Sequence, residues 1–319
     1  MNRSYILQAF TEKPWLILPD KLAALEEIVE RHVAGEKLSA EEVQARIQGG
    51  SRPLDRRVES VAILPLFGTI FPRSNLMTQM SGATSAEIFG KQFQALINDP
   101  EVGAIVLDVN SPGGYSSGIP ELSDLVYAAR GKKPVVAVAN HLMASAAYFV
   151  GTSADEVVAT PSADVGSVGV YAMHADYSAQ LMQAGIKVSF ISAGKYKVDG
   201  NPYEPLSASA RDTIQESVNN VYADFVNAVA RNRGVEAEAV RSGFGEGRVL
   251  NARAALQAGM VDRIATLDQV VDELLGKVTG KSPSNFPLKA ESSALPMTEN
   301  ERQAQSLRTR VEHILQKEK

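Results

Sequence analysis

The chain has 319 residues, of which 45% are hydrophobic and 22% charged, and it contains no cysteine. Its 32 basic and 37 acidic residues give a formal net charge of −5, which argues against a mainly electrostatic binder of nucleic acid. The lack of cysteine excludes disulfides, thiolate nucleophiles and cysteine metal sites. No stretch approaches the roughly 20 uncharged apolar residues of a membrane span, and the first apolar run is too short for a signal peptide. We therefore expect a cytoplasmic protein with no membrane span and no bound cofactor or metal.

Residues 1–51 predict a helical prefix. Apolar residues at helical spacing follow Pro19 and Asp20, namely Leu22, Leu25, Ile28, Val29 and Val33. Ser39 and Glu42 form a capping box that opens a second short helix. We expect this prefix to pack on the following domain or on a neighbour and to carry no chemistry.

From residue 58 the pattern changes to short apolar runs that alternate with amphipathic stretches. The runs predict strands at 61–68, 103–110, 134–140, 155–159 and 187–192, and a strand or turn at 165–171. Helices are expected at 85–97, through 122–126, after residue 145, at 178–184 and at 207–232. Strand–helix alternation predicts parallel strands joined by crossovers, so residues 52–275 are expected to be one α/β domain.

The end of the chain predicts two further segments. Residues 276–297 have the composition of a flexible linker. Thr298 and Glu301 then form a capping box at the start of a helix over 298–319, whose apolar seam is thin. This helix is either a solvated tail or a docking or coiled-coil segment.

Ser145 is the first candidate for chemistry. It stands where an apolar run, 134–140, gives way to a second run that reads as a helix. A turn residue at a helix N-terminus meets free backbone N–H groups that favour negative charge. A serine there can be a nucleophile whose oxyanion the backbone stabilises, although serine is also a common helix cap without any catalytic role.

A serine nucleophile also needs an oxyanion hole and a base. Gly113 and Gly114 follow another expected strand, so they would face Ser145 across the strand ends if the two strands are neighbours. The N–H groups of Gly114 and Ala146 would then make a plausible hole.

Base candidates fall into two groups. The four histidines lack a convincing context: His32, His141, His174 and His313. Lys195 and Lys197 lie in a turn-rich loop after an expected strand. A lysine normally titrates near 10.4 and must lose its charge to act as a base, which burial favours.

Five motifs in order carry a family resemblance: Asn110–Gly114, Ala144–Tyr148, Val165–Gly169, Gly194–Lys197 and Gly247–Asp262. Over roughly residues 58–270 the chain resembles the signal peptide peptidase A (protease IV) family of Ser/Lys peptidases. The resemblance implies a crotonase/Clp-protease-like βα superhelix that assembles into a homo-oligomeric ring. It also implies Ser145 as nucleophile, Lys197 rather than Lys195 as general base, and Gly114 and Ala146 as the oxyanion hole.

The supporting roles are less specific. Gly113 is expected to help shape the hole, and Ser167 is our choice for orienting Lys197. The prefix from Lys13 to Leu25 is similar to the start of the phage head-maturation (capsid) proteases, whose substrates are scaffold, portal or capsid proteins. Ser293–Pro296 would then be a candidate self-processing region, and the setting would be the host cytoplasm or the phage prohead.

Three other functions stay open at this point. One is a bacterial cytoplasmic peptidase of the same family. Another is a crotonase-fold acyl-CoA enzyme, which would share the oxyanion hole but not the Lys197 loop. The third is a non-catalytic assembly protein with a protease-like core.

Overall fold

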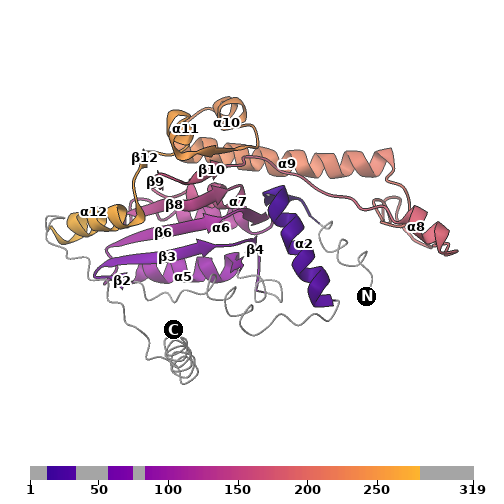
Figure 1. The fold of residues 1–319 in the computed structure, drawn as a ribbon, viewed down its shortest axis with the longest axis horizontal. Coiled ribbons are helices and arrows are strands. Elements are labelled where there is room, and N and C mark those ends of the chain that lie inside the picture. Colours follow the sequence, from indigo (N-terminus) through magenta and orange to yellow (C-terminus); the bar gives the residue numbers. More distant parts are fainter. Residues whose placement is uncertain (1–12, 34–56, 75–82, 281–319) are drawn as a thin grey trace, which may run out of the picture. The chain divides into compact units, whose positions relative to one another are not determined.

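The computed structural model describes residues 13–33, 57–74 and 83–280. Its larger sheet has eight strands, in the order β11-β10-β8-β6-β3-β2, with β9 on β8 and β12 on β9. The parallel centre is β3 (Val61–Phe67), β6 (Ala104–Ser111) and β8 (Val135–Ala144), which lie side by side in Figure 1. The outer strands are β2 (Arg57–Val58), β9 (Glu156–Ala159), β10 (Asp164–Gly166), β11 (Val249–Asn251) and β12 (Arg263–Ile264).

Helices follow the central strands in the expected βα order. They are α5 (Ala86–Asn98), α6 (Ile119–Tyr127) and α7 (Ala146–Gly151), with α12 (Leu267–Thr279) near the end of the described chain. β3, β6 and the first half of β8 are almost entirely buried, as expected of parallel strands covered on both faces. The expected α/β class, with parallel strands joined by helices, is therefore confirmed.

A smaller sheet of four strands, in the order β1-β7-β4-β5, lies at the end of this core. Its members are β1 (Trp15–Ile17), β4 (Ile70–Phe71), β5 (Thr84–Ser85) and β7 (Gly113–Tyr115). β7 needs its glycines. A Cβ on Gly114 would lie 2.0 Å from the Ile70 carbonyl oxygen, and one on Gly113, whose φ is +104°, would lie 2.0 Å from that of Leu16.

The described part of the prefix packs on the following domain, one of the two outcomes expected. The expected helix after Pro19 is present as α2 (Pro19–Val33). It packs with β1 in a small apolar cluster of Trp15, Ile17, Leu22, Leu25 and Phe71. The second prefix helix, the 281–297 part of the linker and the terminal helix lie outside the described residues, so the proposed domain boundaries stay predictions.

The segment between β10 and the long helix differs from expectation. It contains the expected helix as α8 (Ser178–Gln183). The prediction of a strand at 187–192 is wrong, because this stretch is irregular. The reason is that no sheet edge pairs with it: Phe190 is 40% exposed and Ile191 fully exposed. α9 (Ala208–Arg233) follows, then α10 (Ala237–Gly243) and α11 (Ala252–Gln257). Only the C-terminal half of α9 is well buried; α8 lies near its other end (Figure 1).

α7 is held in place by contacts with α9 and with Arg130. The rings of Phe149 and Phe225 stack with centroids 4.8 Å apart, which joins α7 to α9. Arg130 donates hydrogen bonds to the carbonyls of Thr152, Ser153 and Ala154, where α7 ends. A cation at these carbonyls satisfies acceptors that the helix leaves open.

An ion pair ties the last part of the domain to α9. Arg233 donates to both carboxylate oxygens of Asp262, at 2.8 and 2.9 Å, and the Val157 N–H donates to the same carboxylate at 2.7 Å. Burial by itself raises the pKa of Asp262, but the hydrogen bonds from Arg233 and Val157 outweigh it, so the pKa lies below its usual value.

The depressed pKa makes a prediction about acid stability. The contribution of Asp262 is fully present above its unfolded pKa, near 4, and is lost as the pH falls through the folded pKa. Since the carboxylate is 39% exposed, we expect Asp262→Asn to lower the free energy of unfolding by about 1–2 kcal/mol at pH 7. Urea titrations should show this loss shrinking towards pH 3. A loss that is equal at pH 7 and pH 3 contradicts the assignment, and Asp212→Asn on exposed α9 is the control.

The glycine of β7 makes a second prediction. Gly113→Ala combines an unfavourable φ with a backbone clash, whereas Gly131→Ala has a φ of +77° and nothing within 4 Å of the added Cβ. We expect Gly131→Ala to cost about 1–2 kcal/mol of unfolding free energy, and Gly113→Ala to cost at least about 1–3 kcal/mol more. Denaturant unfolding of both variants measures the difference. Equal costs would mean that β1 does not approach Gly113 as closely as described.

Candidate active site

Ser145 lies in the sharp turn between β8 and α7, in a conformation that L-residues rarely adopt. Its φ is +53° and its ψ is −118°. It does not cap the helix, because its side chain accepts no hydrogen bond from the first turn. Its Oγ is buried and has no hydrogen-bond partner among the described residues. A strained residue with an unused buried hydroxyl points to a functional rather than a capping role.

The backbone around Ser145 is held from the neighbouring strand. Its N–H donates to the Gly166 carbonyl at 2.7 Å, and its carbonyl accepts from Phe149 N–H at 2.9 Å. β8 also carries extra residues relative to β6, because the register shifts between the pairs Val109–Ala139 and Ser111–Met143. With this irregularity β8 ends at Ala144, four residues beyond the predicted strand end. Ser145 therefore lies at the edge of the sheet.

The structure brings the predicted glycines and Ser145 together. The point where a Cβ of Gly113 would stand is 2.9 Å from the Ser145 Cβ. The Gly113 N–H is occupied, since it donates to Ser111 Oγ at 3.2 Å. Gly114 pairs instead with Leu16 of β1, and its expected role in the oxyanion hole stays a prediction. Ala146 is the first residue of α7, and a first-turn N–H has no acceptor within its own helix.

Ser167 directly follows Gly166, whose carbonyl binds the Ser145 N–H, and it has no hydrogen bond with a lysine among the described residues. It is buried, has a φ of +55° and follows β10, the strand whose Gly166 binds Ser145. Its N–H donates to the Arg248 carbonyl at 2.8 Å. Its expected role in orienting Lys197 stays a prediction.

Lys197 is not brought to Ser145 within this chain. Residues 194–199 form a turn-rich, exposed loop, and both Lys195 and Lys197 are exposed. Lys195 instead lies over the ring of Tyr196, at 4.8 Å from its centroid. Because Ser145 Oγ is fully buried without a partner, no lysine of the described chain hydrogen-bonds to it.

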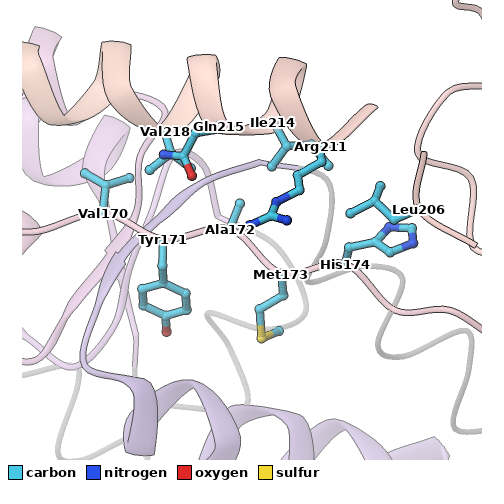
Figure 2. A pocket seen from close by; sticks show the side chains of 10 residues that line it. All are labelled: Val170, Tyr171, Ala172, Met173, His174, Leu206, Arg211, Ile214, Gln215 and Val218. Atoms are coloured by element: carbon cyan, nitrogen blue, oxygen red, sulfur yellow. The ribbon is translucent and has the colours of Figure 1, made fainter. Parts of the chain in front are cut away.

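The two described histidine side chains do not replace the lysine. His141 is exposed, with a φ of +91°, and Ser145 Oγ accepts no hydrogen bond from it. His174 lines a separate pocket of about 400 Å³ between residues 170–174 and α9. In Figure 2 Arg211 reaches from α9 towards this segment, while Tyr171 points away from α9.

β1 is the part of the site that sequence reasoning missed. Trp15 pairs with Tyr115 and Leu16 with Gly114, so β1 lies along the glycine strand beside Ser145. A short apolar run after Pro14, Trp15 to Leu18, was the available signal. Three residues are too few for periodicity to distinguish a strand from the start of the following helix.

The described residues include neither a membrane-spanning helix nor a cluster of metal-ligating side chains. None of their helices is long and apolar enough to cross a membrane. They also contain no cluster of three or more acidic or histidine side chains arranged to hold a metal ion.

Comparison with known proteins places these residues in a family. The profile described as "Peptidase family S49" matches residues 128–279, which include Ser145, Ser167 and Lys197 but not the glycine strand. "Head-tail preconnector protein GP5" of Enterobacteria phage P21 is 29% identical over 285 residues, covering 85% of this chain and 56% of that protein. "Capsid assembly protease C" of Escherichia phage lambda is 31% identical over 239 residues, covering 73% of this chain and 54% of that protein.

Cellular proteins match as well. "Protease 4" of Haemophilus influenzae is 26% identical over 217 residues, which cover 67% of this chain and 34% of that protein. The chain thus spans about half the length of the phage relatives that it matches. Residues 128–279 of the chain are thus similar to peptidase family S49.

Proposed function

We propose that the protein is a serine endopeptidase in which Ser145 is the nucleophile and Lys197 the general base. The observation that carries the proposal is Ser145 itself: a strained residue at a strand–helix turn, whose buried hydroxyl caps nothing and binds nothing in the described chain. The family match and the glycine strand beside the turn support the same chemistry.

The proposed reaction proceeds through an acyl-enzyme. Ser145 Oγ attacks the carbonyl carbon of the substrate while a neutral Lys197 amine takes its proton. The N–H groups of Gly114 and Ala146 stabilise the oxyanion. The C–N bond then breaks, Lys197 gives the proton to the leaving amine, and a water molecule hydrolyses the ester that remains.

We propose further that Lys197 acts on Ser145 of another copy of the chain. In the single chain the lysine is exposed and the serine is buried, so the dyad is incomplete. The same segment exposes large apolar side chains, including Met182 at 78% and Ile191 at 104%. Such a surface favours docking on a neighbour, and burial there would favour the neutral amine that a base requires. A closed ring is the simplest symmetric assembly that completes every site.

The substrates that we propose are proteins of a phage head, such as scaffold, portal or capsid proteins. The names of the two phage relatives support this, and their similarity covers 85% and 73% of this chain. The setting would be the host cytoplasm or the prohead. A cellular peptidase of the same family is the alternative that the similarity to protease 4 keeps open.

The dyad is tested by substitution. We expect Ser145→Ala and Lys197→Ala each to lower peptide cleavage by roughly 10³-fold or more, because nucleophile and base act as a unit. Lys195→Ala, in the same exposed loop, should keep activity close to that of the wild type. Cleavage retained in Lys197→Ala, or lost equally in Lys195→Ala, would reject Lys197 as the base.

Completion of the site by a neighbour is tested by mixing the two inactive variants. If Ser145 and Lys197 come from different copies, refolding Ser145→Ala with Lys197→Ala at equal amounts should restore about a quarter of wild-type activity, since one interface in four is then intact. A mixture that stays inactive, while it assembles normally by gel filtration and light scattering, contradicts a dyad shared between copies.

A further inference from the structure

β1 is held on both of its edges by backbone, as a bound peptide strand would be. On one edge the Ser116 N–H donates to the Pro14 carbonyl at 3.3 Å, and the Leu18 N–H donates to the Pro112 carbonyl at 3.1 Å. On the other edge Trp15 and Tyr171 exchange hydrogen bonds of 2.8 and 3.2 Å. An extended segment therefore fills the space between β7 and residue 171.

The register places one peptide carbonyl at the reacting position. In an antiparallel ladder hydrogen-bonded pairs recur at every second residue. The pairs Pro14–Ser116 and Leu18–Pro112 are hydrogen-bonded, so the pair between them, Leu16 and Gly114, has the same phase. The Leu16 carbonyl thus faces the N–H that we assign to the oxyanion hole. The point where a Cβ of Gly113 would stand lies 2.0 Å from the Leu16 carbonyl oxygen and 2.9 Å from the Ser145 Cβ, so both groups lie beside Gly113.

The side chain of Leu16 occupies an apolar subsite. It is fully buried in the main core, whereas Trp15 and Ile17 point to the other face of β1 and pack with α2. A cavity of about 260 Å³ adjoins Leu16 and is lined also by Phe149 of α7 and Val221 of α9. The side chain before the reacting carbonyl would lie in this region.

From these contacts we infer that residues 14–18 occupy the peptide-binding groove of the peptidase domain as an intramolecular inhibitor. A substrate strand and the chain's own segment compete for the edge of β7, so the segment must leave before a protein can be cleaved. The groove selects extended peptides with a medium-sized apolar residue, such as leucine, before the reacting carbonyl. The inference rests on the proposed function in taking Ser145 as the nucleophile, but occupancy of the groove is measurable without catalysis.

A reversible lock tests the competition. The chain has no cysteine, so Trp15→Cys with Tyr115→Cys introduces a single thiol pair at directly opposed positions of β1 and β7. Built on Ser145→Ala, the full-length variant is titrated against a fluorescent peptide with the sequence of residues 13–20. Fluorescence anisotropy gives the dissociation constant in the reduced and in the oxidised form.

We expect the oxidised form to bind the peptide about tenfold or more weakly than the reduced form, because the lock lowers the population of the open groove. The two redox states of one variant are compared because Tyr115→Cys also removes the contact of the Tyr115 ring with Trp15, 4.9 Å between centroids, which the probe peptide would make. Arg57→Cys with Ala62→Cys, opposed on β2 and β3, is the matched control and should show no redox dependence. Equal affinity of the locked and reduced forms would overturn the inference.

A second measurement separates this inference from the proposed function. With Ser145 restored, the reduced lock variant should cleave an extended peptide faster than the wild type, and oxidation should stop it. If peptide binding depends on the redox state but no peptide is cleaved, residues 14–18 do occupy the groove and the proposed peptidase function is rejected. If the reduced and oxidised forms cleave the peptide equally fast, the peptidase function stands and the inhibitory role of residues 14–18 is rejected.

Discussion

The turn at Ser145 is the constraint on which the site depends. The positive φ of Ser145 is tolerated because the neighbouring strand binds its N–H. In addition, Arg130 and the stack of Phe149 on Phe225 hold α7 in place. Local strain of this kind persists only when the surrounding structure over-determines it. The Ser145 side chain thereby lies beside the glycine strand and does not cap its own helix.

Much of this arrangement could be predicted from the sequence. Buried parallel strands are continuous apolar runs, so β3, β6 and β8 and the helices between them were visible in the pattern. The meeting of Ser145 with Gly113 and Gly114 followed from adjacent parallel strands ending at the same edge. The length of β8 did not follow, because a shift of register at residues 109–111 leaves no mark in the order of apolar residues.

Two features depend on contacts that the sequence does not encode locally. β1 is a strand only because β7 and Tyr171 offer it two edges. The stretch 187–192 has the composition of a strand but no edge to pair with in one chain, and it is therefore irregular and exposed. On our account β1 fills the groove of its own chain. The exposed segment with the stretch 187–192 completes a site only when it docks on another copy. Peptide cleavage would then require both a neighbour and a displaced β1, which restrains a protease until it meets its substrate.

The central claim is that a lysine from another copy completes the serine site. The most direct test is the structure of the assembled protein, in which the separation of Ser145 Oγ and Lys197 Nζ can be measured across every interface. Our account predicts a hydrogen-bonding distance of about 2.6–3.2 Å between atoms of different copies. An assembly in which every Lys197 remains in solvent, or reaches the Ser145 of its own chain, would contradict it.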